Sequence, residues 1–440
     1  CRFYCLTFNF PVKIYRSIAK LFSSLNEICF KGFPDVRWNF IFGRLSLYFQ
    51  CKEFDRKAKL VSILDFFYSL FFPKTPSYNI EKKGTKGILL LNNCCDRKTN
   101  IDKLHIISDL IQSRTIILGD RPRRRFNIIY TFNILLYIPF WLLSFRKRDI
   151  PFVQKLIMLN RLAYLYQVFG YIKKNIEIHN YSLFVSYYDS LTEDSFWEEL
   201  FRLEKIKTAS LQHGQFISYR ENTVINCGIE LRTFKSDFLL CWNNYTKREA
   251  VISGIDESRL PILGIIGYAG KEHWSKCTKP DNDIFGVVIG HPDYIDENIT
   301  LIDAANNLSR AKGLKYYLKL HPSYKDDFFK DIVDQNLYLG NVKKGIDMID
   351  YANMVDFSIV GSSTVFTELI FLGHEVIRYS NQGIKDKYRD IKVGLTFSEP
   401  KQIVDVYNKG NFEVDSLFDD LCSIREVRSS YQTFFSTFDI

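Results

Sequence analysis

Short runs typical of buried strands alternate along this chain with segments of helical apolar spacing. Residues 355–360 (VDFSIV) form a β-branched and aromatic run that Gly361 interrupts. Residues 365–372 then have the apolar spacing of a helix, and residues 375–379 again favour a strand. This stretch therefore predicts a strand, a turn rich in hydroxyl groups, a helix and a second strand.

The same alternation occurs in two series. The first contains the strand-like runs GILLLNN, RTIILGD, SLFVS, TASLQ and DFLLC, and the second contains FGVVIG, LKYYLKL and NLYLGN, with a helix expected after each run of the second series. Repeated strand–helix units are typical of parallel α/β sheets. The segment RLPILGIIGY, with its proline and glycines, separates the two series and reads as an interdomain connection. We therefore expect one domain over residues 76–262, a second over 263–414, and a final helix over 415–440.

The amino-terminal part differs in character. Residues 1–75 alternate apolar, aromatic and basic residues, which predicts a helical extension that either packs on a domain or contacts a membrane surface. Pro73, Pro76 and EKKGTKG mark its boundary with the first domain. Residues 126–145 form the most apolar window, but asparagines and a proline interrupt it, so we expect a buried or interfacial pair of helices rather than a membrane span.

Composition narrows the class of protein. Hydrophobic residues make up 46% and charged residues 25% of the 440 residues, which indicates a globular protein and excludes disordered and collagen-like classes. The net charge of +9 favours an anionic partner, while the absence of zinc-finger or RNA-binding signatures argues against nucleic acid. Ten scattered cysteines without a C-x-x-C pair, and no evident signal peptide, predict a cytoplasmic protein.

Two motifs in the second series carry the candidate chemistry. The turn Ser362-Ser363-Thr364 precedes a predicted helix, where hydroxyl groups cap the helix or donate to an anion at its positive end. His321-Pro322 ends the strand-like run of the preceding unit. Both would lie at the carboxyl ends of parallel strands, which is where ligands bind in open α/β sheets. Together they predict a phosphate site.

These motifs resemble those of known families. His-Pro followed by a Ser-Ser/Thr turn is similar to the paired motifs of bacterial sialyltransferases, polysialyltransferases and Kdo transferases, which contact the nucleotide and phosphate of a CMP-sugar. LQHGQF, LKLHP and GSST also resemble the teichoic-acid polymerases that use CDP-glycerol. The chain lacks the acidic-acidic-Gly motif of the first group and has LQHGQ where the second has WHGT.

The resemblance implies a fold and an activity. The fold is α/β of the GT-B type, with two Rossmann-like domains facing a cleft and a helical amino-terminal extension. The activity is transfer of a sugar from a nucleotide donor, with a CMP-activated acidic sugar such as Kdo or sialic acid preferred, to a growing bacterial surface polysaccharide on an oligosaccharide or lipid-linked acceptor. A CDP-polyol phosphotransferase and a non-catalytic glycan-binding partner of an assembly complex stay as alternatives. Such an enzyme works in the cytoplasm at the inner face of the membrane.

The chemistry requires few groups. A base must accept the proton of the acceptor hydroxyl, and positive potential must stabilise the leaving phosphate. His213, in the His-Gly turn of the first series, is the preferred base, and Asp189 competes as base or as nucleophile. His321 and the N-terminus of the helix after the Ser-Ser-Thr turn would supply positive potential, with Lys319 and Lys325 as nearby cations. The resemblance implies that Glu368 accepts a ribose hydroxyl, although an acid in the first helical turn also complements the helix dipole. We expect no metal ion and no cofactor other than the donor itself.

Two further groups are weaker candidates. His291-Pro292 follows the first strand of the second series without a hydroxyl-rich turn. A basic cluster is expected to follow the strand RTIILGD, where it either meets an anionic acceptor or forms a solvated loop; its members are Arg121, Arg123, Arg124 and Arg125.

Overall fold

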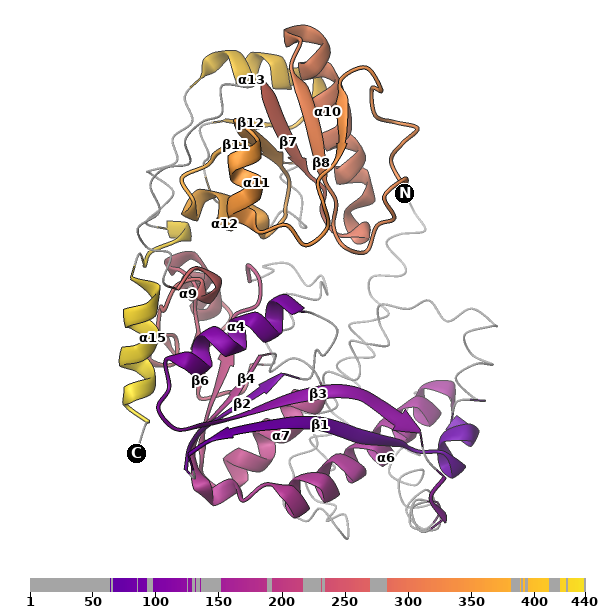
Figure 1. Cartoon of the computed structure of the whole chain (residues 1–440), viewed down its shortest axis with the longest axis vertical. Helices are drawn as coiled ribbons and strands as arrows, with labels where there is room; N and C mark the ends of the chain where they lie inside the picture. Colours follow the sequence, from indigo (N-terminus) through magenta and orange to yellow (C-terminus); the bar gives the residue numbers. More distant parts are fainter. Residues whose placement is uncertain are drawn as a thin grey trace.

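The chain folds into two α/β units, which Figure 1 shows one above the other. The computed structural model describes residues 64, 66–84, 86–92, 98–124, 126–128, 131, 135, 152–187, 192–216, 231, 234–269, 283–380, 388, 391, 395–410, 420–424 and 426–438. Most of the amino-terminal extension and of the apolar window 126–145 thus lies outside the described residues.

The first unit is built on a sheet with the strand order β1-β3-β2-β4-β5-β6. Its strands are β1 (Lys74–Lys83), β2 (Gly87–Asn92), β3 (Arg114–Arg124), β4 (Tyr181–Ser186), β5 (Lys207–Leu211) and β6 (Phe238–Leu240). Helix α4 (Lys98–Asp109) covers one face, and α6 (Phe152–Asn175) and α7 (Thr192–Leu203) cover the other, while α9 (Asn244–Ile252) follows β6. Strands β2 to β6 run parallel to one another, as their buried, mostly apolar sequences predict.

Two features of strand β1 and its partner β3 differ from the sequence-based expectation. The segment that we expected to be a boundary pairs antiparallel with β3, and the pairing shifts register between Thr75 and Ser77, around Pro76. Proline lacks the N–H that a regular ladder needs, so it is tolerated at such an irregularity on an edge strand. The pairing also extends β3 to Arg124, so Arg123 and Arg124 lie within the strand rather than after it.

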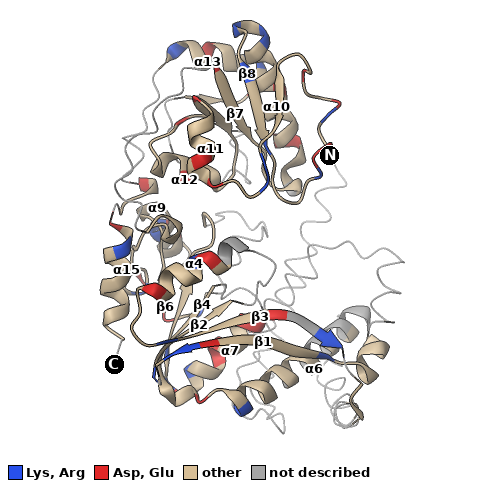
Figure 2. Ribbon diagram, viewed as in Figure 1, with Lys and Arg blue, Asp and Glu red and all other residues tan. Residues whose placement is uncertain are grey.

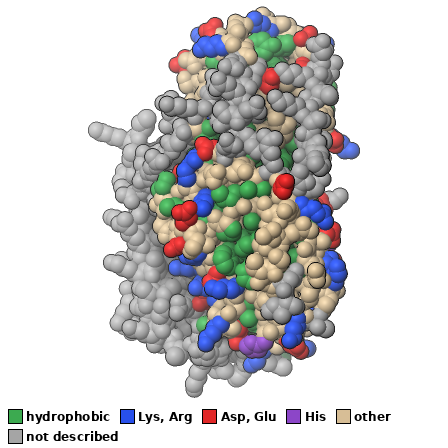
Figure 3. Space-filling view, turned by 90° about the vertical axis from the view of Figure 1, so that its left-hand side faces the viewer, with side chains coloured by type: hydrophobic (Ala, Val, Ile, Leu, Met, Phe, Trp, Pro, Cys, Tyr) green, Lys and Arg blue, Asp and Glu red, His purple; other side chains and the backbone are tan. Residues whose placement is uncertain are grey.

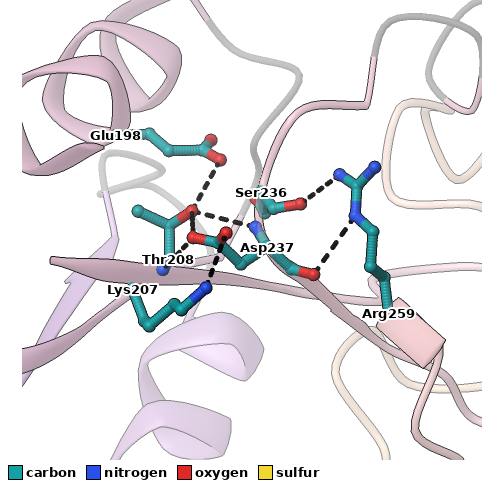
Figure 4. Close-up of polar contacts among 6 residues, drawn as sticks. All are labelled: Glu198, Lys207, Thr208, Ser236, Asp237 and Arg259. Carbon is teal, nitrogen blue, oxygen red and sulfur yellow. Dashed lines mark hydrogen bonds and ion pairs between the residues drawn. The ribbon is translucent and has the colours of Figure 1, made fainter. Parts of the chain in front are cut away.

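The amino edge of the first sheet is held by side chains that Figure 4 shows. Thr208 donates its N–H to Asp237 Oδ2 over 2.9 Å, and the Asp237 N–H donates to the Thr208 hydroxyl over 3.0 Å. Arg259 donates to the carbonyl oxygens of Ser236 and Asp237. Because this network lies at the start of β5, at the opposite edge from the carboxyl ends of the strands, we assign it to the framework.

The second unit is a parallel sheet with the order β12-β11-β10-β7-β8-β9. Its strands are β7 (Ile284–Val288), β8 (Lys315–Lys319), β9 (Tyr338–Asn341), β10 (Phe357–Val360), β11 (Glu375–Tyr379) and β12 (Thr396–Phe397). With β7 counted as strand 1, this is the doubly wound order 3-2-1-4-5-6 read from its far edge. The predicted α/β fold with two Rossmann-like units, the GT-B organisation, is thereby confirmed.

Helices cover both faces of the second sheet. The helix α10 (Ile295–Lys312) and the shorter α13 (Ile403–Lys409) pack on one face, and α11 (Met348–Met354) and α12 (Val365–Phe371) pack on the other. The prediction of a helix between LKLHPS and NLYLGN is wrong. Residues 322–336 instead form successive turns, because the backbone bonds run from Phe328 to Lys325 and from Ile332 to Phe329, while Tyr324 is buried.

The two units share a buried core. Trp242 and Tyr268 from the end of the first unit pack in one cluster with Phe366 and Leu369 of α12. The chain then returns to the first unit, where α15 (Val427–Ser436) packs Tyr431 against that unit's core. Figure 3 shows the side on which α15 lies, with hydrophobic side chains in the lower unit between charged ones.

Candidate active site

The candidate site lies at the topological switch point of the second sheet. After β7 the chain crosses to β8 on one side. After β10, which is the neighbour of β7 on the other side, the chain crosses to β11 in the opposite direction. Val288 pairs with both Val360 and Lys319, which places the carboxyl ends of β7, β10 and β8 at one level. Open α/β sheets bind ligands at this position.

Two histidine turns meet here. His291 follows β7 and His321 follows β8, and their ring centroids are 5.0 Å apart in an edge-to-face arrangement. The Ser323 N–H donates to His321 Nδ1 over 3.2 Å, which fixes the orientation of that ring, while Pro322 is exposed. The structure therefore brings the weaker candidate His291 directly beside the stronger one.

The Ser-Ser-Thr turn follows β10, but its hydroxyl groups contact protein atoms. Ser362 donates its N–H and its hydroxyl to the two carboxylate oxygens of Glu297, over 2.7 and 3.0 Å. The Ser363 hydroxyl accepts the N–H of Val365 over 3.3 Å, while the N-cap residue Thr364 makes no side-chain cap bond to α12. In this structure the Ser362 hydroxyl therefore donates to an internal carboxylate.

The His-Gly turn of the first unit is held by two glutamines that sequence reasoning missed. Gln212 donates through Nε2 to the Gly214 carbonyl over 2.8 Å, and its Oε1 accepts the Trp242 N–H over 2.6 Å. Gln215 donates to the Thr246 hydroxyl over 2.8 Å. The two glutamines of LQHGQ were the sequence signal that could have identified this support. Buried amides beside a turn require hydrogen-bond partners, which a neighbouring element supplies.

The two units meet at these turns. The Gln215 N–H points to the Thr364 hydroxyl over 3.4 Å, and a Cβ on Gly214 would lie 3.4 Å from the same oxygen. His213, half-buried with its ring edge-to-face on Phe216, therefore belongs to a turn that contacts the Ser-Ser-Thr turn of the opposite unit.

Glu368 and Lys319 lie in a partly buried group beside the turns. Glu368 Oε2 accepts the hydroxyl of Tyr268 over 3.1 Å. Burial lowers the pKa of the Lys319 ammonium, and the nearby Glu368 charge opposes that shift. Lys319 Nζ also lies 5.7 Å from the centre of the Tyr351 ring. Burial, reinforced by Glu368, raises the pKa of Tyr268 well above its usual value, so this hydroxyl stays protonated and donates.

Some candidates are not placed. Asp189 follows β4 in the sequence but lies outside the described residues, as do Arg125 and the residues before position 64. Within the described part of the chain, no group of three His, Cys, Asp or Glu side chains could hold a metal ion. None of the helices described is long and apolar enough to cross a membrane.

A groove of about 480 Å³ lies elsewhere, along α9 and the residues that follow it. Its lining includes Lys247, Arg248 and Ile252, and no residue of the strand ends described above contributes to it. We therefore keep the candidate site at the carboxyl ends of the strands.

Comparison with known proteins gives weak likenesses only. No protein-family model matches the chain, and no curated protein matches it. Among solved structures, UDP-GlcNAc 2-epimerase from Neisseria meningitidis bound to UDP-GlcNAc is 12% identical with a TM-score of 0.48, over 80% of this chain and 99% of the other.

Two other solved structures are similar at the same level. A structure of the wall teichoic acid polymerase TagF soaked with CDPG is 12% identical with a TM-score of 0.44, over 87% of this chain and 98% of the other. Anabaena Alr3699/HepE in complex with UDP is 12% identical with a TM-score of 0.45, over 80% of this chain and 95% of the other. At these TM-scores the likenesses carry no argument, and the fold rests on this chain's own strand order.

Proposed function

We propose that this protein is a glycosyltransferase that moves a sugar from a nucleotide donor to a growing bacterial surface polysaccharide. The observation that carries the proposal is the contact between Gln215 and Thr364. It sets the His213-Gly214 turn of one Rossmann-like unit against the switch point of the other. A donor held at the second sheet would then lie within reach of a base from the first.

The second unit would hold the nucleotide and stabilise its leaving phosphate. His321 and His291 lie just after adjacent strand ends, and Lys319 is the last residue of β8, which precedes His321. Positive groups in a partly buried position stabilise developing negative charge more strongly than the same groups in water. We propose that these three side chains, rather than a metal ion or a further cofactor, bind the phosphate.

His213 is the proposed base for the acceptor hydroxyl. An imidazole has a reference pKa near neutrality, so it can accept a proton at physiological pH without a large shift. Its turn is fixed by Gln212 and Gln215, and such rigid support favours a precise approach to the donor. Asp189 remains the alternative base or nucleophile.

We propose a CMP-activated acidic sugar as donor, a preference that rests on the motif resemblance. Phosphate retained in the product would instead identify a CDP-polyol phosphotransferase. The net charge of +9 suits an anionic donor and an anionic glycan acceptor.

We also propose that the protein works at the inner face of the cell membrane. A surface of exposed apolar side chains supports this, formed by Leu64, Phe67, Tyr68, Phe71, Phe72, Phe126 and Ile128. The rings of Tyr68 and Phe72 stack at 4.9 Å, and Phe126 lies 5.8 Å from Phe72. Arg124 lies over the Tyr68 ring and exposed Arg123 is its neighbour, at the basic tip of β3 in Figure 2. Aromatic rings with adjacent arginines suit the interface of an anionic membrane. We name these seven apolar residues the aromatic surface.

Calorimetric titration of the purified chain with CMP, CDP, UDP, GDP and dTDP tests the proposal. We expect CMP to bind most tightly. Preference for CDP would favour the polyol-phosphate activity, and preference for UDP, GDP or dTDP would change the donor. If none of the five bound, the proposed function would be wrong and the non-catalytic alternative would lead.

A further inference from the structure

Two consecutive residues of α10 contact both turns that flank the switch point. Glu297 accepts the N–H and the hydroxyl of Ser362, in the turn after β10. Asn298 Oδ1 accepts the Gly290 N–H over 2.7 Å, and its Nδ2 donates to the Gly290 carbonyl over 3.2 Å, in the turn after β7. One helical turn thus binds two strand ends that are far apart in the sequence.

We infer that Glu297 and Asn298 are positioning residues, which together hold these two turns in the geometry that binds the nucleotide. The inference rests on the proposed function and adds a role for residues that touch no substrate. Neither residue was a candidate from the motifs.

The glycine of the turn after β10 fits this role, whereas the turn after β7 leaves an ordinary contact distance at its glycine. A Cβ on Gly361 would lie 2.1 Å from Glu297 Oε1, and a Cβ on Gly290 would lie 3.4 Å from Asn298 Oδ1. The Gly361 position therefore excludes any side chain while Glu297 keeps its place. The close approach of a carboxylate to the backbone explains why glycine precedes Ser362.

Glu297 and Asn298, which we call the clamp, are buried, so the loss of their hydrogen bonds would be costly. Glu297 is 7% exposed and Asn298 is fully buried. A buried donor that loses its partner costs more than the bond itself contributes, because water cannot replace the partner. The first turn of an 18-residue helix also stabilises the Glu297 carboxylate through the helix dipole.

The two residues lead to different parts of the site. Asn298 Nδ2 also lies 3.4 Å from the His291 carbonyl and 3.0 Å from the Tyr324 hydroxyl. It therefore supports the turn that carries His291 and, through Tyr324, the turn that begins at His321. Glu297 supports the turn that ends at Thr364, which meets Gln215 of the first unit. Because Ser362 gives both donors to Glu297, the phosphate would bind on the imidazole side of the switch point.

The test compares three variants of the full chain. Glu297→Gln and Asn298→Ala weaken the clamp. Asn306→Ala is the matched control, because Asn306 lies on the same helix, is 6% exposed, and bonds to Ile332 and Tyr316 away from both turns. Each variant is examined for thermal unfolding without ligand, for the Kd of the nucleotide that the wild type binds best, and for amide hydrogen exchange at residues 288–292 and 360–365.

We expect all three variants to unfold at a lower temperature. Only the two clamp variants should raise the nucleotide Kd, by about tenfold or more, and speed exchange in both peptides. Ser362→Ala removes only the hydroxyl, so it tests the same contact if Glu297→Gln does not fold. Combining Ser362→Ala with Glu297→Gln should cost less affinity than the two separate losses together, because both act on one contact.

Two results would separate the inference from the proposed function. If the clamp variants bound nucleotide as tightly as Asn306→Ala does, Glu297 and Asn298 would be ordinary core residues and the inference would be wrong. If the wild type bound no nucleotide, the proposed function would fail. In that case unchanged hydrogen exchange in the clamp variants would also refute the clamp as a structural device.

Discussion

The hydroxyl of Tyr268 donates to Glu368 Oε2 over 3.1 Å, and this bond joins the connection between the units to the first turn of α12. Tyr268 is buried in the core that both units share. The bond orients the carboxylate to which the motif resemblance assigned a ribose hydroxyl. A nucleoside bound through Glu368, as we propose, would meet this carboxylate in the orientation that Tyr268 sets.

Tyr268→Phe should weaken nucleoside binding without affecting phosphate binding. Loss of one hydrogen bond to a carboxylate is worth about 1–2 kcal/mol, so we expect the Kd for the preferred nucleotide to rise roughly five- to thirtyfold. Calorimetry with inorganic pyrophosphate should show no change. Tyr431→Phe is the control, since that buried hydroxyl bonds to the Gly264 carbonyl on α15's side of the molecule. An equal loss for pyrophosphate would contradict a role through Glu368.

Alanine variants of the two turn histidines should separate binding from turnover. His321→Ala removes a group at the proposed phosphate position, and we expect a Kd increase of about 10- to 100-fold. His213→Ala should leave the Kd unchanged and lower kcat by about 10²- to 10⁴-fold, which is the usual contribution of a general base. Single-turnover kinetics with the identified donor measures both. Loss of binding in His213→Ala with normal turnover at saturation would reverse the assignment.

Lys319→Met should stabilise the protein at neutral pH while weakening nucleotide binding. Burial lowers the pKa of Lys319, so between that lowered value and its unfolded value near 10.5 the unfolded chain binds more protons than the folded chain. The contribution of Lys319 to the free energy of unfolding therefore rises with pH through that window. Below the window the buried ammonium destabilises the folded chain to its full extent. We expect the variant's advantage in unfolding free energy to shrink as the pH approaches 10. Urea unfolding at pH 7 and pH 9.5 measures the difference, and an advantage that is constant with pH would contradict the burial of a charged Lys319.

The motifs located the strand ends correctly because each is a local signal. An apolar run followed by His321-Pro322 or by Gly361 marks where a strand stops, and parallel strands bring their ends together. The contact between Glu297 and Ser362 could not be predicted in this way. It joins residues 65 positions apart, and an acid in the first turn of a helix looks the same whether it faces solvent or a neighbouring strand.

Two local predictions failed because tertiary contacts outweighed propensity. The segment after His321 has residues that suit a helix, yet Tyr324 bonds to Asn298 and packs on Phe329, so successive turns form instead. Pro76 and the segment EKKGTKG predicted a boundary between the amino-terminal extension and the first domain. Pairing with β3 made this segment an edge strand, with the proline at an irregularity of the ladder.

Gly286→Ala should destabilise the second unit. A Cβ at this position would lie 2.0 Å from the hydroxyl of Tyr351, whose ring is fully buried beneath β7. Overpacking of a core typically costs about 1–3 kcal/mol. The control is Gly170→Ala in α6, where a Cβ meets nothing within 4 Å and alanine should instead add up to about 1 kcal/mol. Urea unfolding measures both changes, and equal stability of the two variants would show that Tyr351 can move aside.

Serine substitutions on the aromatic surface should reduce membrane binding. Phe72→Ser and Phe126→Ser together remove two adjacent rings, 36% and 62% exposed, without touching the strand ends. We expect vesicles that contain anionic lipid to retain the variant at least tenfold less than the wild type, and added salt to weaken the wild type through Arg123 and Arg124. Phe328→Ser is the control, because that ring is 55% exposed but lies on the second unit. Co-sedimentation measures the bound fraction of each protein. Equal loss in the control, or undiminished binding in the double variant, would mean that this surface does not contact lipid; a change from dimer to monomer in the double variant would assign it to a second copy of the chain.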